Sequence, residues 1–585
     1  MTFARSFPLV LWTMVLAACP GDPATTTEST TEPPGDTPGT STSTGETTEA
    51  PTTEVPTTGA PTTGDSTTTS TTGTTGDTTT TGGDGAITRV LYHPHVVINN
   101  AQAASAARYV EIVDGVAQPP VTLVDPGGLP LTRGEAVVDG RWAPYYTFGP
   151  EPPRLWAVDL DALAAHEVAL PPDAERIALA KTSRDESHLI VWFAPQGSSD
   201  GADYQYYVCA LGPAGECELA PVESAAGPAT YIDDIHDISG TSGRIWYSTA
   251  EVDGPGRTEL MGDVTAPADA ITLAEFPDYD SGHFSFVSLD EKTVYFNLAD
   301  GAETHAMDIS ADPPGPMVSL HPPLPGVRRR WSDDEKDLLL FVSDGLWGDL
   351  SHVAVDGASA GPMVDLNTGG PGHVYTKPLQ LLPDRRVLIL ADIEAPMINH
   401  AYVLDIAEPD APPLQPSGPL GPTGTVNDAF VRDDPAHVFY YAQETDQSPN
   451  ELYRARLEPP GEPHKLNAPL PDGSYLLSGA FATSADGQRV IYAGSEVADR
   501  LDLFLVEFAG EAPGTPVNLT SGLQDEVHLL GRLGPDAAQA FFAVKDANNE
   551  FGALYMVPLS PEVGPPQAIS AAGEQVQQYY LLPAK

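Results

Sequence analysis

Six polar residues at comparable places along the chain are of types that bind anions or metals. Each stands five to eleven residues before a turn that recurs through the sequence. The six are His236, His283, Arg328, His373, Asn427 and His528. Imidazole nitrogens ligate metals and pair with carboxylates when protonated, and guanidinium groups bind carboxylate or phosphate through paired donors. Gathered at one mouth of a central channel, they are expected to hold an acidic or metal-bound ligand.

The same six residues have a plainer interpretation, in which they are unrelated polar side chains on solvated loops. Lone histidines are usually structural or half-exposed rather than ligands. The two interpretations differ in geometry, because one ligand in an ordinary pocket cannot be shared by side chains more than about 15 Å apart. Both stay open at the level of sequence.

The chain contains no motif typical of a catalytic or nucleotide site. A G-x-S-x-G elbow, an HExxH motif, a Walker loop and a dinucleotide fingerprint are all absent. Two stretches imitate the start of a calcium loop, and they contain Asp278, Asp280 and Gly282, and Asp546, Asn548 and Glu550. Neither has the Gly at the sixth position or the Glu at the twelfth that such a loop needs. We therefore predict no catalytic residue, metal or cofactor, with calcium as the alternative.

Two cysteines flank a turn-like stretch. Cys209 and Cys217 lie on either side of the sequence Gly-Pro-Ala-Gly at 212–215. A hairpin brings facing residues within disulfide reach, and disulfides persist in oxidising compartments. We predict a bond between Cys209 and Cys217 that acts as a local staple, and two reduced thiols are the alternative.

The recurring turn belongs to a repeat that is clearest at 481–520. Ser484-Ala485-Asp486-Gly487 has the composition of a tight turn, in which Asp caps backbone amides and Gly adopts a positive φ. Short strands follow at 490–492, 503–506 and 516–519. A tandem unit of about fifty residues with four short strands is typical of a β-propeller blade. The sequence predicts an all-β propeller of four-stranded blades, in which the repeated Asp residues are turn caps.

The repeat can be followed by its turn residue. Spacings of 44 to 52 residues, with one gap of 105, separate Asp139, Asp185, Asp290, Asp334, Asp384, Asp434, Asp486 and Asp536. Within the long gap, Thr241 occupies the position that Asp has in the other copies. We interpret His93 as the mark of a degenerate first copy. Ten registers are therefore readable.

We assign 86–585 to the propeller, with degenerate copies over 86–177 and clearer ones over 178–585. Rings usually contain four to eight blades. Ten registers allow one large ring, two smaller rings, or a ring of about eight blades with the first two copies packed outside it; we favour the last. Residues 579–582 repeat the pattern of a first strand and are expected to pair with the first blade and close the ring.

The N-terminal segment has the pattern of an export signal. Residues 1–18 contain a short apolar run and end before Cys19 as Leu16-Ala17-Ala18-Cys19, which resembles the lipobox of bacterial lipoproteins. The resemblance implies cleavage, acylation of Cys19 and a lipid-anchored location in the bacterial cell envelope, at the outer membrane; an ordinary export signal is the alternative. Residues 19–85 lack Lys, Arg and aromatics, so we predict a disordered acidic tether.

The overall charge limits the partners. The chain has 28 Lys and Arg against 81 Asp and Glu, a formal net charge of −53. Such a surface repels phosphate backbones and anionic lipid. We therefore expect no nucleic-acid partner, contact with the membrane only through the lipid, and a monomer.

The turn, the V-x-Y strand and the closing N-L-T of 481–520 resemble the WD40-like repeats of TolB-type propellers from bacterial envelopes. The resemblance extends over most of 130–585 and implies a binding module for an envelope protein or glycan partner. Related repeats also form the propeller of prolyl-oligopeptidase-type peptidases, but no hydrolase domain follows here. The alternative function is a propeller enzyme, a polysaccharide lyase or hydrolase that uses the channel mouth.

Overall fold

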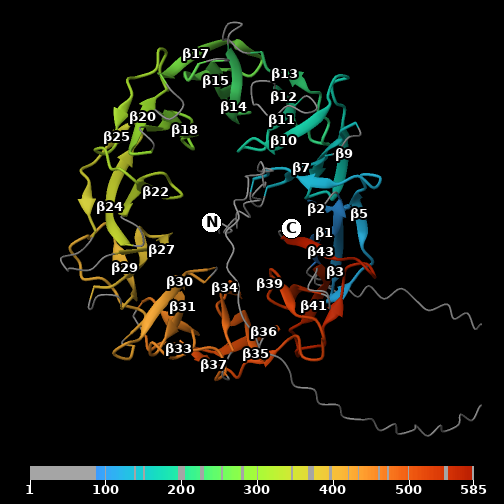
Figure 1. Cartoon of the computed structure of the whole chain (residues 1–585), viewed down its shortest axis with the longest axis vertical. Helices are drawn as coiled ribbons and strands as arrows, with labels where there is room; N and C mark the ends of the chain where they lie inside the picture. Colours follow the sequence, from blue (N-terminus) through green and yellow to red (C-terminus); the bar gives the residue numbers. More distant parts are fainter. Residues whose placement is uncertain are drawn as a thin grey trace, which may run out of the picture. The chain divides into compact units, whose positions relative to one another are not determined.

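The computed structural model describes residues 87–582 with short gaps, and these residues form β-strands and their connections (Figure 1). The gaps are 99–100, 138–139, 149–151, 195–203, 224–229, 252–253, 278–281, 299–300, 344–346, 367–373, 394–397, 419, 433, 459–460, 471–473, 498–499 and 546–550. The predicted signal peptide, Cys19 and the tether lie outside the described residues, as do Asp278, Asp280, Asp546, Asn548 and Glu550 of the calcium-like stretches. No helix among the described residues is long and apolar enough to cross a membrane.

Five blades are four-stranded antiparallel sheets in chain order. Blade 3 contains β10 (Arg176–Thr182), β11 (His188–Ala194), β12 (Gln205–Ala210) and β13 (Ala220–Pro221). Blade 4 contains β14 (Thr230–Ile238), β15 (Arg244–Glu251), β16 (Arg257–Asp263) and β17 (Ala266–Phe276), and blade 5 contains β18 (Gly282–Val287), β19 (Thr293–Leu298), β20 (Glu303–Asp308) and β21 (Val318–Ser319). Blade 8 contains β30 (Thr425–Phe430), β31 (His437–Gln443), β32 (Glu451–Arg456) and β33 (His464–Lys465), and blade 10 contains β39 (Val527–Leu533), β40 (Gln539–Lys545), β41 (Phe551–Pro558) and β42 (Gln567–Ala568).

The other blades vary this plan at their edges. Blade 1 contains β43 (Val576–Leu582), β1 (Ile87–Ile98), β3 (Ala107–Val113), β4 (Val116–Ala117) and β5 (Val121–Val124). Blade 2 contains β6 (Leu131–Arg133), β7 (Trp142–Thr147), β8 (Leu155–Asp159) and β9 (Ala164–Val168). The short strand β2 (Ala101–Ala104) pairs with β1 and with β6 and so links the two blades. Blade 6 contains β22 (Val327–Trp331), β23 (Asp337–Ser343), β24 (Trp347–Asp356), β25 (Ser359–Ala360) and β26 (Val364–Asp365), and blade 7 contains β27 (Val374–Leu382), β28 (Arg386–Ala391) and β29 (His400–Asp405). Blade 9 contains β34 (Leu476–Thr483), β35 (Arg489–Val497), β36 (Arg500–Ala509), β37 (Ala512–Pro513) and β38 (Val517–Asn518).

Figure 1 shows the first strand of each blade at the inner side of a ring. We call β43, β6, β10, β14, β18, β22, β27, β30, β34 and β39 the inner strands. Because side chains alternate between the two faces of a strand, each blade presents one apolar face to each of its neighbours.

Ten hydrophobic cores, each between two consecutive blades, hold the described residues together. Phe439 of blade 8 and Phe481 of blade 9 share one such core. The core of Phe541 in blade 10 and Val90 in blade 1 completes the cycle. The described residues therefore form one ring of ten blades. The ten registers and the alternative of one large ring are thus confirmed. The favoured ring of about eight blades with two copies outside was wrong, because the N-terminal copies also bury both of their faces.

The C-terminal strand closes the ring. β43 pairs antiparallel with β1, from Arg89 opposite Leu582 to Pro94 opposite Val576. Tyr579 is buried within this strand and donates its hydroxyl to the carbonyl of Phe541 at 2.9 Å. The prediction that the chain end pairs with the first blade is confirmed.

The recurring turns use Ser and Asp as caps. The Ser Oγ donates to the Asp Oδ1 at 2.6 to 2.9 Å in four turns, which are Ser183 with Asp185, Ser288 with Asp290, Ser332 with Asp334, and Ser484 with Asp486. Asp486 Oδ1 also accepts from the backbone N of Gln488 at 3.0 Å. The interpretation of these Asp residues as turn caps is confirmed.

In several copies the residue after the turn Asp adopts a left-handed conformation although it is not Gly. Its φ is 64° at Gly487, 58° at Glu186 and 62° at Arg385. A non-glycine residue costs about 1 kcal/mol there. The side chain offsets this cost by reaching the preceding blade: Glu186 accepts from the backbone N of Trp142 at 3.0 Å, and Arg385 donates to Asp337 at 2.7 and 3.0 Å. These contacts account for the loss of Gly from most copies.

His93 does belong to the first copy, blade 1, but it lies within a strand and not at a turn position. It lies within β1 opposite Gln578, is 4% exposed, and its Nε2 lies 2.9 Å from the hydroxyl of Tyr145. Blade 1 has no turn between its first two strands, because the inner strand comes from the other end of the chain. Burial, with the charge of Arg133, lowers the pKa of His93 to about 3.

The buried closure strand predicts a large loss of stability on truncation of Tyr579. Tyr579→Ala should lower the free energy of unfolding by about 3–5 kcal/mol, because a large side chain leaves a closed core. Tyr579→Phe should cost about 1 kcal/mol through the lost hydrogen bond. Urea unfolding measures both, with Tyr475→Ala, whose side chain is 42% exposed, as the control. If Tyr475→Ala and Tyr579→Ala lowered the free energy of unfolding equally, the closure of the ring by β43 would be contradicted.

The buried neutral His93 predicts a loss of stability in acid. The unfolded chain takes up a proton near pH 6.5, whereas the folded chain resists protonation until about pH 3. The contribution of neutral His93 to the free energy of unfolding is therefore fully present above pH 6.5. It falls by about 1.4 kcal/mol per pH unit below that value. Between pH 7 and 5, the wild type should lose about 2 kcal/mol more than His93→Gln in urea unfolding. Equal losses of stability in the wild type and in His93→Gln would contradict this explanation.

Candidate ligand site on the inner strands

The structure places five of the six predicted ligand residues on inner strands. His236 lies on β14, His283 on β18, Arg328 on β22, Asn427 on β30 and His528 on β39. His373 and the side chain of His528 lie outside what the structure describes.

His236 and His283 are brought together on neighbouring inner strands. The charge of His236 contributes to lowering the pKa of His283, after burial and Arg257. Arg328 stands on the next blade, and the whole of blade 7 separates it from Asn427. The Asn427 amide instead donates to the Asn450 side chain of its own blade at 2.5 Å.

His236 is held between two carboxylates. Its Nε2 lies 2.8 Å from Glu259 Oε2, its Nδ1 lies 3.2 Å from Asp234 Oδ2, and its ring stacks on Phe284 with centroids 4.2 Å apart. Burial opposes the charged imidazolium, but the hydrogen bonds to Asp234 and Glu259 outweigh it and raise the pKa of His236. The ring nitrogens are thus committed to protein partners.

Arg257 completes a balanced ion network around His236. Its guanidinium lies 2.9 Å from Glu259 and 3.3 Å from Asp233, and its Nη2 donates to Ser248. Lys181 of blade 3 lies 3.9 Å from Asp234. Burial raises the pKa of Asp233, although Arg257 opposes this. Three carboxylates thus face three cations, so the network attracts no ligand by net charge. No set of three or more His, Cys, Asp and Glu side chains in the described residues is placed to hold a metal.

β22 presents cations that have no partner. It reads Val-Arg-Arg-Arg-Trp, and Arg328 and Arg330 are exposed on one face while Arg329 lies on the other. Arg329 donates to Gly301 and Thr304 of blade 5. The side chains of Arg328 and Arg330 make no hydrogen bond or ion pair with a described residue. Because an inner strand meets solvent at the inner wall, both guanidinium groups are available there to an anion.

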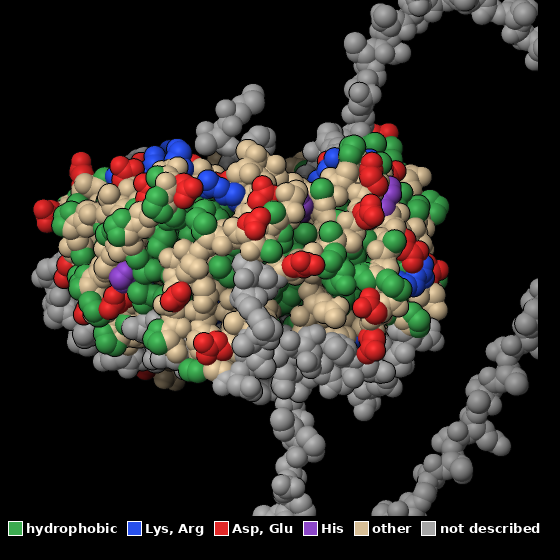
Figure 2. Space-filling view, turned by 90° about the horizontal axis from the view of Figure 1, so that it is seen from above, with side chains coloured by type: hydrophobic (Ala, Val, Ile, Leu, Met, Phe, Trp, Pro, Cys, Tyr) green, Lys and Arg blue, Asp and Glu red, His purple; other side chains and the backbone are tan. Residues whose placement is uncertain are grey.

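The inner strands invert the charge balance of the chain. They carry eight Lys or Arg and four Asp, against 28 basic and 81 acidic residues in the whole sequence. The eight are Arg133, Arg176, Lys181, Arg328, Arg329, Arg330, Lys377 and Arg532, and the four are Asp233, Asp234, Asp237 and Asp428. Carboxylates are scattered over the outer wall in Figure 2. Of the eight, Arg328, Arg330 and Arg532 have exposed side chains, and exposed guanidinium groups attract anions.

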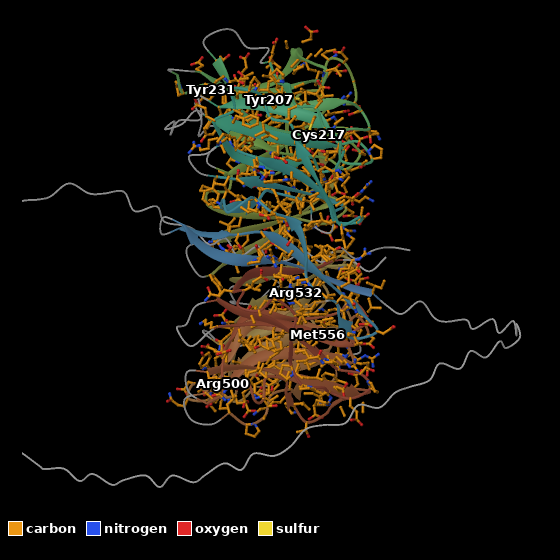
Figure 3. All side chains as sticks on the ribbon, turned by 90° about the vertical axis from the view of Figure 1, so that its right-hand side faces the viewer. Tyr207, Cys217, Tyr231, Arg500, Arg532 and Met556 are labelled. Atoms are coloured by element: carbon orange, nitrogen blue, oxygen red, sulfur yellow. A yellow bond between two sulfur atoms is a disulfide. The ribbon has the colours of Figure 1, made fainter. Side chains whose placement is uncertain are left out.

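Sequence reasoning found Arg328 but missed its partner Arg330 and the other basic residues of the inner strands. Arg532 of β39, labelled in the edge view of Figure 3, is exposed on blade 10. The three consecutive arginines at 328–330 were a usable signal, since alternation along a strand places the first and third on one face. The others could not be found without knowing which strands are innermost.

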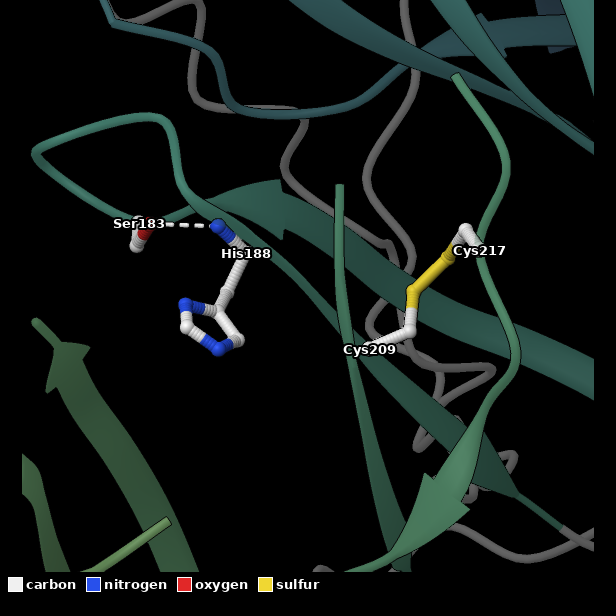
Figure 4. Close-up of a disulfide and its surroundings, with 4 residues drawn as sticks. All are labelled: Ser183, His188, Cys209 and Cys217. Atoms are coloured by element: carbon white, nitrogen blue, oxygen red, sulfur yellow. Dashed lines mark hydrogen bonds between the residues drawn. A yellow bond between two sulfur atoms is a disulfide. The ribbon is translucent and has the colours of Figure 1, made fainter. Parts of the chain in front are cut away.

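The two cysteines of blade 3 form a disulfide away from the inner strands. Cys209 at the end of β12 is joined to Cys217, with Cα atoms 5.5 Å apart (Figure 4). In the same view, the backbone N of His188 donates to Ser183 Oγ at 3.0 Å, which belongs to the turn cap. The bond closes a loop between the third and fourth strands, so it is a local staple.

The chain resembles known proteins at the level of fold. It matches no protein-family model and no curated protein. Similar solved structures include a eukaryotic initiation factor (9% identity, 85% of this chain and 99% of that chain, TM-score 0.42) and TolB from Acinetobacter baumannii (16% identity, 48% and 64%, TM-score 0.24). Oligogalacturonate lyase in complex with manganese also resembles it (14% identity, 64% and 97%, TM-score 0.28). All three identities are below 25% and all three TM-scores are below 0.5, so these likenesses do not resolve the function.

The buried network predicts unequal costs for two similar substitutions. Glu259→Gln should lower the free energy of unfolding by about 3–5 kcal/mol, because it leaves Arg257 and His236 buried with an incomplete charge partner. Glu167→Gln removes the carboxylate of a bidentate pair with Arg154, but that pair is exposed and should cost less than about 1 kcal/mol. Chemical denaturation measures both. A Glu259 variant as stable as the Glu167 variant would contradict the structural role of the network.

Proposed function

We propose that the protein is a membrane-anchored binding module of the bacterial envelope that captures an anionic ligand on the inner strands of its propeller. The anchor is the acylated Cys19 expected from the lipobox-like sequence, and residues 19–85 form the tether. The ligand belongs to an envelope protein or glycan.

The observation that carries this proposal is the pair of exposed, unpartnered arginines on β22. An unpaired guanidinium at a solvated wall can form charge-assisted hydrogen bonds with a carboxylate or phosphate without first breaking an internal ion pair. The buried network of blade 4 is already balanced, so binding uses the exposed cations and leaves that network intact. His283 is also exposed, on the neighbouring blade, and adds a nearby polar contact.

The second candidate is an enzyme that acts on a polysaccharide at the same wall. A lyase or hydrolase needs an acid and a base within reach of the substrate. His236 with Glu259 is the closest arrangement of that kind, but both side chains are buried and committed to one another. This arrangement therefore favours binding over catalysis.

The arginine pair predicts a specific loss of anion binding. Arg328→Ala with Arg330→Ala should weaken binding of polygalacturonate and poly-L-glutamate to the purified protein at least tenfold by calorimetry, because each lost charge-assisted bond contributes about 1.5–3 kcal/mol. Arg456→Ala, an exposed arginine at the end of β32, is the matched control and should change binding less than twofold. Neutral dextran should not bind.

Unchanged affinity in the double variant, or equal binding of dextran, would refute the proposed site. Recovery of a partner from detergent-solubilised envelope by the wild type and not by the double variant would identify the natural ligand.

A further inference from the structure

The unpaired cations of the inner strands are spread over several blades. Exposed arginines stand on blade 6 as Arg328 and Arg330 and on blade 10 as Arg532, and the half-buried Arg133 of blade 2 lies 4.2 Å from the centroid of the Tyr580 ring. Blade 1 separates Arg133 from Arg532, and three blades separate each of them from Arg328 and Arg330. A ligand that uses all of them must be long and must carry repeated negative charge.

Neutral hydrogen-bonding groups lie between these cations. Exposed side chains on the described inner strands include Ser285 on β18 and Gln578 on β43. Asn427 on β30 and Ser478 on β34 are exposed as well, and although they donate to Asn450 and Asp428, their oxygen atoms can still accept. Amide and hydroxyl groups both donate and accept hydrogen bonds. Such a lining suits a chain that is rich in hydroxyl groups as well as charged.

Apolar platforms are nearly absent from the same wall. Leu477 is the one large hydrophobic side chain on the described inner strands that is exposed. The half-buried Phe286, Trp331, Phe430 and Tyr580 of these strands already contact other rings or Arg133. Single-stranded nucleic acid is normally held by stacking on exposed aromatics. A polypeptide ligand normally inserts apolar side chains into matching pockets of the protein that binds it. Both classes are therefore disfavoured.

We propose that the ligand is an extended carboxylated polysaccharide that contacts the inner strands of several separate blades. Arg328 and Arg330, two residues apart on one face of a strand, stand about 6.6–7 Å apart along it and can each take one carboxylate of the chain. The neutral amides and hydroxyls bind its hydroxyl groups. This inference rests on the proposed function and adds the class and length of the ligand.

The test is the dependence of affinity on ligand length, measured on the whole purified protein. Galacturonate oligomers of two, four, eight and sixteen units are titrated by calorimetry at fixed ionic strength. The affinity per molecule should rise more than thirtyfold from four to sixteen units, well beyond the roughly fourfold expected from the number of binding registers alone. Multipoint attachment along one chain produces this excess.

Substitutions on separate blades give an independent readout. Arg532→Ala should weaken the sixteen-unit ligand at least threefold and leave the two-unit ligand unchanged, whereas Arg328→Ala with Arg330→Ala should weaken both. Arg456→Ala is the control for general charge. The multiblade contact would be overturned if the affinity rose fourfold or less from four to sixteen units, or if Arg532→Ala changed the affinity for neither ligand. Either result would leave anion binding at β22 intact.

The class of polymer is tested with probes of matched charge. Poly-L-glutamate and a thymidine oligonucleotide of sixteen charges should bind at least tenfold more weakly than the sixteen-unit galacturonate. Equal binding of either would overturn the assignment to a polysaccharide. Loss of all anion binding, in contrast, would refute the proposed function itself.

Discussion

The packing of one blade against the next is the interaction on which the rest of the structure depends. A four-stranded sheet with apolar side chains on both faces cannot bury them alone, so each blade requires two neighbours. Every described core contains residues of two consecutive blades, and the last core joins the two ends of the chain. The pairing of β43 with β1 converts an open array with two exposed ends into a cycle without any.

This packing also decides where charge is tolerated. Glu259 and Arg257 lie where blade 4 meets blade 5, out of water, and there each charge has an opposite partner. Arg328 and Arg330 lie on an inner strand in contact with solvent, where an unpaired guanidinium remains hydrated at little cost. The buried charges are thus matched for stability, and the unmatched ones are left at the inner wall, where a ligand can reach them.

Several elements were predictable from local sequence. The Ser-x-Asp turns and the β-branched strands around 490–492 depend on contacts within one hairpin, and residues near in sequence make those contacts. The chain-end strand was also predictable, since 579–582 has an inner-strand pattern but no blade of its own. The number of blades was not predictable in this way, because the curvature of the ring depends on the fit of ten interfaces between distant residues. His93 was misread for a related reason: its strand partner is almost 500 residues away.

The sequence by itself determined the all-β blade plan, the turn caps and the strand pattern of the closing segment, because these follow from side-chain alternation and turn chemistry over a few residues. Only the tertiary structure decided the ten-blade ring, the burial of His93 and the identity of the inner strands. The basic character of the inner wall belongs to this second group. It arises from assigning ten short segments to one side of a closed ring, and in an acidic chain their few arginines are conspicuous only after that assignment.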